Sequence, residues 1–388
     1  MKIVYLLPGG LYNSGGMERV ITIKANYLSE IMNFNVSVVT TEQMGRPVFY
    51  PLSEQVHLYH LNIGIHEKFG KESYIEKCVS RVLKTQEYKR ALRKLLAEIR
   101  PDIIISTLGG LDIGFLNSLQ KDSIKIGELH FPGNYRQLMA RKLSDAFIPN
   151  GIAKIRTWTF KRQCEKLDKL VVLTREEKAL WKNRHSIDVI PNPIPFLPSE
   201  SSSLCSKKAI AVGRLVYEKG FDLLIEAWKA VAGKHPDWEL NIYGNGNEKD
   251  RLIRLIQENR LEQQIKIHEP VKNIQEQYLG SSMFLLSSRY LEALPMVMLE
   301  AMGCGLPLVA FDAPCGPKDI ISDGVNGFLV TTGDIQTLTE KINQLIESKE
   351  LRQKMGKASK QFAADYQVEK IMKLWIDLFE NECKRSII

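Results

Sequence analysis

The chain has 388 residues, of which 44% are apolar and 25% are charged. These fractions are close to the average for globular proteins and exclude a disordered, collagen-like or disulfide-scaffold chain. The length predicts two domains. No apolar run approaches the roughly 18–20 residues that cross a bilayer. The run at residues 3–7 is too short for a signal-peptide core, so we interpret it as a buried first strand.

Basic residues outnumber acidic ones, with 53 Lys and Arg against 45 Asp and Glu, and the net charge is +8. This excess allows a phosphorylated metabolite, nucleic acid or anionic lipid as partner without choosing among them. The six cysteines form no CxxC pair, and no His joins them at metal-ligand spacing. We therefore expect reduced thiols in a cytoplasmic protein.

Short apolar runs alternate with longer helical patterns along the whole chain. In the first half, strands are predicted at residues 4–7, 36–41, 103–107, 124–129, 170–174 and 188–190, and helices at 17–32 and 74–99. In the second half, strands are predicted at 209–212, 239–243, 265–268, 283–287, 307–310 and 328–330, and helices at 220–232, 249–259, 274–279, 296–303, 338–348 and 352–364. Buried strands that alternate with helices predict parallel sheets with right-handed crossovers.

Proline and serine are concentrated at residues 191–203. Such a stretch has little reason to pack in a core and predicts an interdomain linker. The expected fold class is α/β, with two doubly wound domains at residues 1–195 and 196–366 that face a central cleft. Residues 367–388 contain an amphipathic pattern at 368–384, and we expect this last helix to pack back on the first domain.

The segment Gly213–Gly220 follows a predicted strand and opens a predicted helix. It places Arg214 on the loop and Lys219 beside the helix N-terminus. Two cations next to free backbone N–H groups form a binding site for a diphosphate. The alternative is a pair of solvated charges in an ordinary loop.

Two glutamates, Glu292 and Glu300, are separated by seven residues. Because Pro295 suits the first turn of a helix, Glu292 is expected in the preceding loop and Glu300 more than a turn inside the helix. Such a loop directs backbone N–H groups and one carboxylate into the cleft, and Glu300 would accept hydrogen bonds from vicinal hydroxyls such as those of a ribose. The alternative, a solvated Glu300, is disfavoured by its apolar neighbours.

Two further features lie in the first half. Gly15 and Gly16 open a predicted helix, where glycine allows close approach of a ligand to the backbone. Their spacing is not that of the GxGxxG fingerprint, so a dinucleotide-dependent hydride transfer is poorly supported. His130 lies at the carboxyl end of a predicted strand, the edge at which open parallel sheets bind ligands. The alternative for Gly15 and Gly16 is a flexible loop, and the alternative for His130 is a structural role.

These residues together resemble the retaining GT-B glycosyltransferases of family 4. The resemblance covers most of the chain: the glycine-rich start, His130, the G-R-x-x-x-x-K-G loop, the Tyr-Gly-Asn-Gly segment at 243–246, the two glutamates and residues 322–330. The chain departs from the family pattern after Glu292, where Ala-Leu-Pro replaces Gly-Phe-Gly, and at residues 268–271. The Pro-Cys-Gly-Pro run at 314–317 resembles a subset that builds capsules, O-antigens and related surface glycans.

The resemblance implies that the second domain binds a UDP-sugar or GDP-sugar donor and that the first binds the acceptor. Arg214 and Lys219 would neutralise the diphosphate, Glu300 would hold the ribose, and Glu292 would contact hydroxyls of the hexose. His130 would reach the hexose from the first domain, and Gly15 and Gly16 would lie against the phosphates. The other implied donor-binding positions are Gly244, Val271, Leu294, Pro295, Met296 and Val297.

No Asp-x-Asp motif occurs in the chain, and the family needs none because cations and helix N-termini do the work of a divalent metal. The expected reaction therefore has no metal and no cofactor. It would transfer a hexosyl or N-acetylhexosaminyl group to a hydroxyl of a glycan or polyprenyl-diphosphate-linked acceptor, with retention. Glu292 as a covalent nucleophile is the less favoured path; in the favoured path the leaving diphosphate takes the acceptor proton.

Basic residues are dense at 77–100 and 136–169, and in the second stretch they are interleaved with Trp158 and Phe160. A basic face with aromatic residues suits an anionic membrane surface, which predicts peripheral attachment to the inner face of the cytoplasmic membrane. The alternative is a solvated helix face, and no nucleic-acid reading motif is present. Alternative functions for the whole chain are a GT-B sugar-nucleotide epimerase or phosphorylase-like enzyme and a non-catalytic subunit of a glycan-assembly complex.

Overall fold

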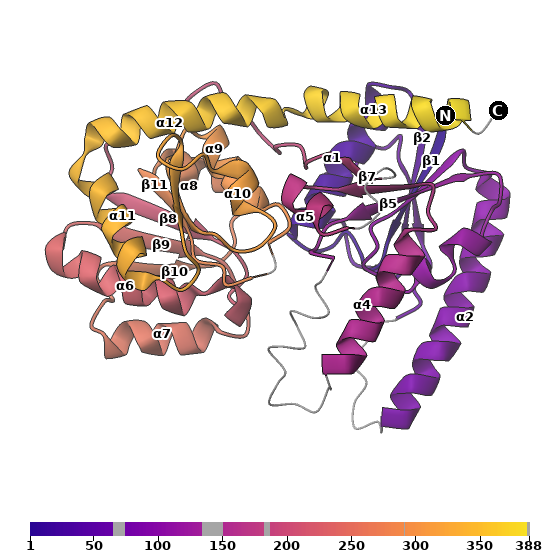
Figure 1. Ribbon diagram of the computed structural model, residues 1–388, viewed down its shortest axis with the longest axis horizontal. Coiled ribbons are helices and arrows are strands. Elements are labelled where there is room, and N and C mark those ends of the chain that lie inside the picture. The colour runs from indigo at the N-terminus through magenta and orange to yellow at the C-terminus, as the bar shows by residue number, and fades with distance from the viewer. Residues whose placement is uncertain (65–73, 134–149, 182–186, 291, 386–388) are drawn as a thin grey trace. The chain divides into compact units, whose positions relative to one another are not determined.

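The computed structural model describes residues 1–64, 74–133, 150–181, 187–290 and 292–385. The chain divides into two units by its contacts. Residues Met1–Pro193 and Val368–Ile388 form the N-terminal unit, and Ile194–Gln367 form the C-terminal unit. Each unit is built on a parallel sheet flanked by helices (Figure 1). The predicted α/β class with doubly wound domains is confirmed.

The N-terminal unit has a seven-stranded sheet in the order β3-β2-β1-β4-β5-β6-β7. Its strands are β1 Lys2–Leu7, β2 Asn35–Thr40, β3 His57–His60, β4 Ile103–Ser106, β5 Ile124–Leu129, β6 Lys169–Val172 and β7 Ile187–Val189. Its helices are α1 Gly16–Glu30, α2 Tyr74–Ile99, α4 Asn150–Cys164, α5 Arg175–Ala179 and α13 Val368–Arg385, with 3₁₀ turns at Asp112–Gly114 and Leu116–Ser118.

Strand β1 shows why both faces of this sheet are covered. Successive side chains of a strand point to opposite faces. Ile3 and Tyr5 enter a core with α1 and α13, and Val4 and Leu6 enter a second core with α2 and α4. The last helix, α13, thus packs on the N-terminal unit through its apolar stripe, which includes Trp375.

The C-terminal unit has a six-stranded sheet in the order β10-β9-β8-β11-β12-β13. Its strands are β8 Lys208–Val212, β9 Glu239–Tyr243, β10 Ile265–His268, β11 Met283–Leu286, β12 Leu308–Phe311 and β13 Gly327–Val330. Its helices are α6 Phe221–Lys234, α7 Lys249–Glu258, α8 Ile274–Leu279, α9 Met296–Gly303, α10 Pro317–Ile320, α11 Ile335–Glu347 and α12 Lys349–Ala363, with 3₁₀ turns at Tyr217–Lys219 and Ala364–Tyr366. The strand order reverses between β8 and β11, and at such a switch point the loops diverge and leave room for a ligand.

The boundary between the two units, at Pro193 and Ile194, falls within the predicted linker at residues 191–203. The expectation that this segment does not pack in a core was wrong for part of it. Ile194 is only 2% exposed, and its backbone N–H donates to Tyr366 O at 2.7 Å. Ser202 is also buried, and its hydroxyl donates to the Ser281 carbonyl. Isolated apolar side chains and hydroxyls that satisfy backbone groups anchor this segment, and composition alone does not reveal them.

Three elements of the N-terminal unit were not predicted. Strand β3, with the sequence His-Leu-Tyr-His, is a partly exposed edge strand without an apolar run. Helix α4 was not predicted either. Helix α5 follows directly after the predicted strand at 170–174. The strand itself, β6, ends at Val172, and the Thr174 side chain caps α5 by accepting from Glu177 N at 3.1 Å. A threonine that favours strands is therefore used as an N-cap.

Candidate active site

The loop after β8 approaches the loop after β11 very closely. It ends in the 3₁₀ turn Tyr217–Lys219 and at Gly220, whose φ is +63°. A Cβ atom at this position would lie 2.1 Å from the carbonyl oxygen of Ser287. Only glycine satisfies both conditions, so the Lys-Gly pair places a lysine directly beside the end of β11.

Lys219 and Glu292 meet at this point. The Lys219 ammonium donates to Glu292 Oε1, and the same oxygen accepts from the Ser288 hydroxyl. The side chain of Lys219 is 20% exposed and that of Glu292 is 5% exposed. Among the described residues none donates to Glu292 Oε2. The cluster therefore presents one ammonium and one carboxylate oxygen for a ligand.

Arg214 lies on the same loop. Its side chain is exposed, and no partner is found for it within the described part of the chain. The loop after β9 packs against this segment, because a Cβ atom at Gly244 would lie 1.9 Å from Gly213 O. The structure therefore brings Gly244 beside the Arg214 loop, as close backbone packing rather than as a flexible turn.

Helix α9 carries the second glutamate. Glu300 is 4% exposed, and its Oε2 accepts from the Tyr278 hydroxyl at 2.9 Å. The alternative of a solvated Glu300 is therefore wrong. Pro295 is the N-cap and provides no side-chain cap, so the first N–H groups of the helix, at Met296 and Val297, remain available to a ligand.

Two other predicted donor positions differ in burial. Leu294 is buried, at 5% exposure, and its side chain is therefore part of the protein interior. Val271, after β10, is 40% exposed. The structure gives no contact that joins Val271 to the Lys219–Glu292 cluster.

Sequence reasoning assigned no role to several neighbours of the site. Tyr278 and Ser288 hold the two carboxylates. A Cβ atom at Gly316 would lie 3.2 Å from Glu292 Cβ and 2.9 Å from Pro295 Cδ. The Pro-Cys-Gly-Pro run was therefore a usable signal, because it forms a turn that packs against the glutamate loop.

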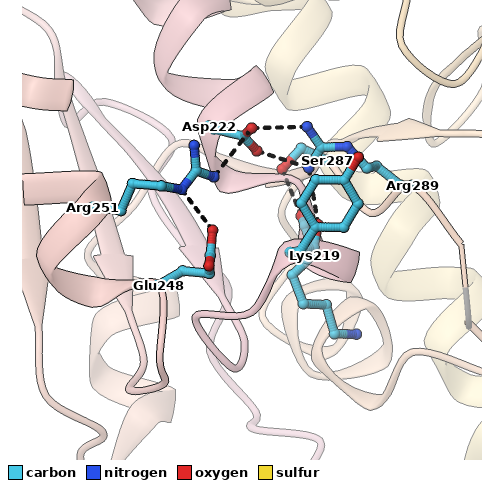
Figure 2. Close-up of polar contacts among 7 residues, drawn as sticks. Lys219, Asp222, Glu248, Arg251, Ser287 and Arg289 are labelled. Carbon is cyan, nitrogen blue, oxygen red and sulfur yellow. Dashed lines mark hydrogen bonds and ion pairs between the residues drawn. The ribbon is translucent and has the colours of Figure 1, made fainter. Parts of the chain in front are cut away.

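A row of charged side chains supports the same loops. Figure 2 shows Arg289, Asp222, Arg251 and Glu248 joined in series. Arg289 binds Asp222 through two parallel bonds of 2.7 and 2.8 Å. Burial would raise the pKa of Asp222, but the hydrogen bonds and charges of Arg289 and Arg251 lower it below its ordinary value. The Asp222 carboxylate thus stays ionised and holds Arg289 in place.

His130 belongs to a buried cluster of the N-terminal unit. Lys24, on α1, is fully buried and donates to Glu128 Oε2 at 2.6 Å, while His130 Nε2 lies 3.2 Å from Glu128 Oε1. The Lys24 ammonium also lies 3.7 Å from the centre of the Trp375 ring of α13. Burial would raise the pKa of Glu128, but the charges of Lys24 and His130 lower it to about 2.

The remaining predictions for this unit concern its surface. Gly15 is the N-cap of α1 and Gly16 is its first residue.

The predicted membrane-facing stretch includes two aromatic residues of α4. Trp158 is 57% exposed, whereas Phe160 is 2% exposed and packs in the core, so the prediction that Phe160 lies on a membrane-facing surface was wrong. The face of α4 that carries Phe160 is the one turned to the sheet. Arg136, Arg141 and Lys142 lie outside the described residues. Within the described ranges, none of the helices combines the length and the hydropathy that a bilayer-spanning segment requires.

Comparison with known proteins assigns the family. Residues 199–362 match the family described as glycosyl transferases group 1. Over 97% of its length the chain is 30% identical to 99% of an uncharacterized glycosyltransferase of Haemophilus influenzae. It is likewise 30% identical, with the same coverage of both chains, to the amylovoran biosynthesis glycosyltransferase AmsD of Erwinia amylovora. This chain is a group 1 glycosyltransferase.

The fold of this glycosyltransferase is also found among solved structures. A complex of S. aureus TarM with fondaparinux, α-GlcNAc-glycerol and UDP superposes over 97% of this chain and 99% of that chain, with a TM-score of 0.75 and 17% identity. The two Rossmann-like domains are those of the GT-B fold. In the C-terminal unit of this glycosyltransferase, Lys219 is paired with Glu292 and Gly244 packs against the Arg214 loop.

Proposed function

We propose that this glycosyltransferase moves a hexosyl or N-acetylhexosaminyl group, with retention, from a UDP-sugar or a GDP-sugar to a hydroxyl of a surface-glycan acceptor. The observation that carries the proposal is the cluster of Lys219, Ser288 and Glu292 at the switch point between β8 and β11. UDP in the TarM complex and the amylovoran biosynthesis named for AmsD support the donor and acceptor classes.

The charges of the cluster match the charges of the proposed reaction. As the bond between the anomeric carbon and the diphosphate breaks, negative charge grows on the leaving oxygen. Lys219 and Arg214 would stabilise that charge, with a contribution of roughly 3–4 kcal/mol for each preorganised donor. The acceptor oxygen forms the new bond to the anomeric carbon, and its proton passes to the leaving diphosphate. The bond to the diphosphate breaks as the bond to the acceptor forms, so the reaction needs no protein nucleophile.

The carboxylates would hold the donor rather than react. Glu292 has one oxygen committed to Lys219 and Ser288, so its other oxygen would accept from a hexose hydroxyl. Glu300, in the middle of α9, would accept hydrogen bonds from the ribose hydroxyls. The N–H groups of Met296 and Val297 would bind phosphate or sugar oxygens at the helix N-terminus.

The other assignments follow the family resemblance. We assign His130 to the donor hexose, Gly15 and Gly16 to the phosphates, and Gly244 and Val271 to the nucleotide. The reaction would need no metal, because the cations Lys219 and Arg214 and the N-terminus of α9 would neutralise the diphosphate. The acceptor would be a glycan or a polyprenyl diphosphate glycan, reached by peripheral binding to an anionic membrane.

The test starts with a thermal-shift screen of nucleotide sugars, since a bound donor raises the melting temperature by mass action. Turnover of the hit is then measured for Lys219→Ala and Arg214→Ala. Each is expected to lower kcat/KM by roughly 10²–10³, because diphosphate charge grows toward the transition state. Lys207→Ala is the control, because Lys207 is an exposed lysine of the same unit that pairs with Asp237.

Two outcomes would contradict the proposal. Full activity of Lys219→Ala would show that the Lys219 ammonium does not stabilise the leaving diphosphate. Inversion of the anomeric centre, read by NMR of the product, would exclude the retaining path.

A further inference from the structure

The turn that carries Lys219 is held by another loop through its backbone. Three successive carbonyls, those of Tyr217, Glu218 and Lys219, accept hydrogen bonds from the segment that follows β11. Tyr217 O accepts from Arg289 Nη1 at 2.9 Å, Glu218 O from the Arg289 backbone N–H at 2.9 Å, and Lys219 O from the Ser287 hydroxyl at 3.0 Å. Two residues thus satisfy every carbonyl of the turn.

Arg289 is itself fixed in three ways. Its guanidinium binds both oxygens of Asp222, in the first turn of α6, through the two bonds drawn in Figure 2. Its carbon Cζ lies 4.3 Å from the centre of the Tyr217 ring. Its side chain is only 14% exposed. A bidentate pair and a stacked ring leave a guanidinium little freedom.

These contacts connect the two loops that carry the charges of the proposed site. Lys219 lies in the turn, and Glu292 lies three residues after Arg289 in the other loop. We propose that Arg289 is a positioning residue that fixes the Lys219 ammonium for the diphosphate by clamping the backbone of the turn. The inference rests on the proposed function, because it assumes that Lys219 meets the donor.

A double-mutant cycle in kcat/KM tests this coupling, with Lys219→Ala as the second substitution. A displacement of about 1 Å in a catalytic group can cost 10²-fold in rate. Arg289→Lys keeps the charge but loses the fork and the stacked plane. We expect this substitution to lower kcat/KM by about 10- to 30-fold in the wild-type background and by less than about 3-fold in Lys219→Ala. Interaction of this kind is the signature of residues that act through one another.

Two further variants separate positioning from general damage. Ser287→Ala removes only the bond to the Lys219 carbonyl, and we expect about a 5-fold loss that also disappears in Lys219→Ala. Lys207→Ala breaks only an exposed pair with Asp237, which involves no carbonyl of the turn, and should change kcat/KM by less than about 3-fold. The melting temperature of each variant is recorded so that rates are compared on folded protein.

The outcomes are distinguishable. Wild-type kcat/KM for Arg289→Lys would overturn the inference and leave the proposed function standing. Equal losses in both backgrounds would also overturn it, because Arg289 would then act independently of Lys219, for instance by binding phosphate itself. Full activity of Lys219→Ala would instead overturn the proposed function.

Discussion

Lys24→Met should strongly destabilise the N-terminal unit, although the substitution exchanges one long unbranched side chain for another. Lys24 has no exposed surface, and its ammonium lies 2.6 Å from Glu128 Oε2 and 3.7 Å from the centre of the Trp375 ring. Methionine would fill the space but leave the buried Glu128 carboxylate without its ammonium partner, with His130 Nε2 still beside its other oxygen. Removing one partner of a buried pair costs about 3–5 kcal/mol.

The pKa of Glu128 indicates the pH range over which ionisation of this carboxylate stabilises the fold. Burial would raise it, but the charges of Lys24 and His130 lower it from 4.5 to about 2. At 1.36 kcal/mol per pKa unit this difference is worth about 3 kcal/mol. Because the pKa is lowered in the folded state, this stability is present above pH 4.5 and is lost as the pH falls toward 2.

Urea unfolding at pH 7.5 and at pH 5, with hydrogen exchange of β1 and β5 to locate the loss, measures the effect. Lys24→Met should lose about 3–5 kcal/mol at pH 7.5 and less at pH 5, where protonation of the unpaired Glu128 relieves the buried charge. Adding Glu128→Gln should recover most of the loss. Lys94→Met, at an exposed position of α2, is the control and should change stability by less than about 0.5 kcal/mol. A loss below about 1 kcal/mol, or one that grows at lower pH, would refute this reasoning.

Three further predictions concern ligands. Glu300→Gln should weaken binding of the free nucleoside diphosphate by about 10-fold in isothermal titration, since uniform ribose binding is its proposed role; an unchanged affinity would make Glu300 structural. Activity should survive excess EDTA, and a loss restored by Mg²⁺ or Mn²⁺ would show that the cations do not suffice. The protein should sediment with anionic but not neutral liposomes, less so at high salt and less for Trp158→Ser, at about 1 kcal/mol per near-surface Lys or Arg. Equal binding to both lipids, or to neither, would leave the basic stretch a solvated face.

The strands of both sheets could be predicted because their apolar runs are bounded by polar residues. The predicted ranges 124–129, 239–243 and 265–268 coincide with β5, β9 and β10. Strand β3 was missed because it is short and partly exposed at a sheet edge. The burial of Ile194 and Ser202 within residues 191–203 was missed because it depends on contacts with residues far along the chain, Tyr366 and Ser281.

For the candidate site too, some residues could be predicted from the sequence and others could not. The charges of Arg214, Lys219, Glu292 and Glu300 are visible in the sequence because each stands in a segment with the pattern of a strand end or a helix start. Their partners are not visible. Lys24 and Glu128 are 104 residues apart, and the Ser287 hydroxyl meets a carbonyl 68 residues away. A pattern read along the chain does not determine which distant group a side chain will meet.

The Lys-Gly pair of the loop after β8 shows how one motif serves two physical requirements. The lysine supplies a cation at the switch point, where β8 and β11 are neighbours in the sheet. The glycine adopts a left-handed backbone conformation, and its backbone lies so close to the Ser287 carbonyl that a Cβ atom would be 2.1 Å from the oxygen. No other residue tolerates both conditions. Without that approach, Arg289 and Ser287 would not reach the carbonyls of the turn, and the lysine would lie on a longer and looser loop. Gly220 therefore determines where the charge of Lys219 lies, although glycine carries no charge itself.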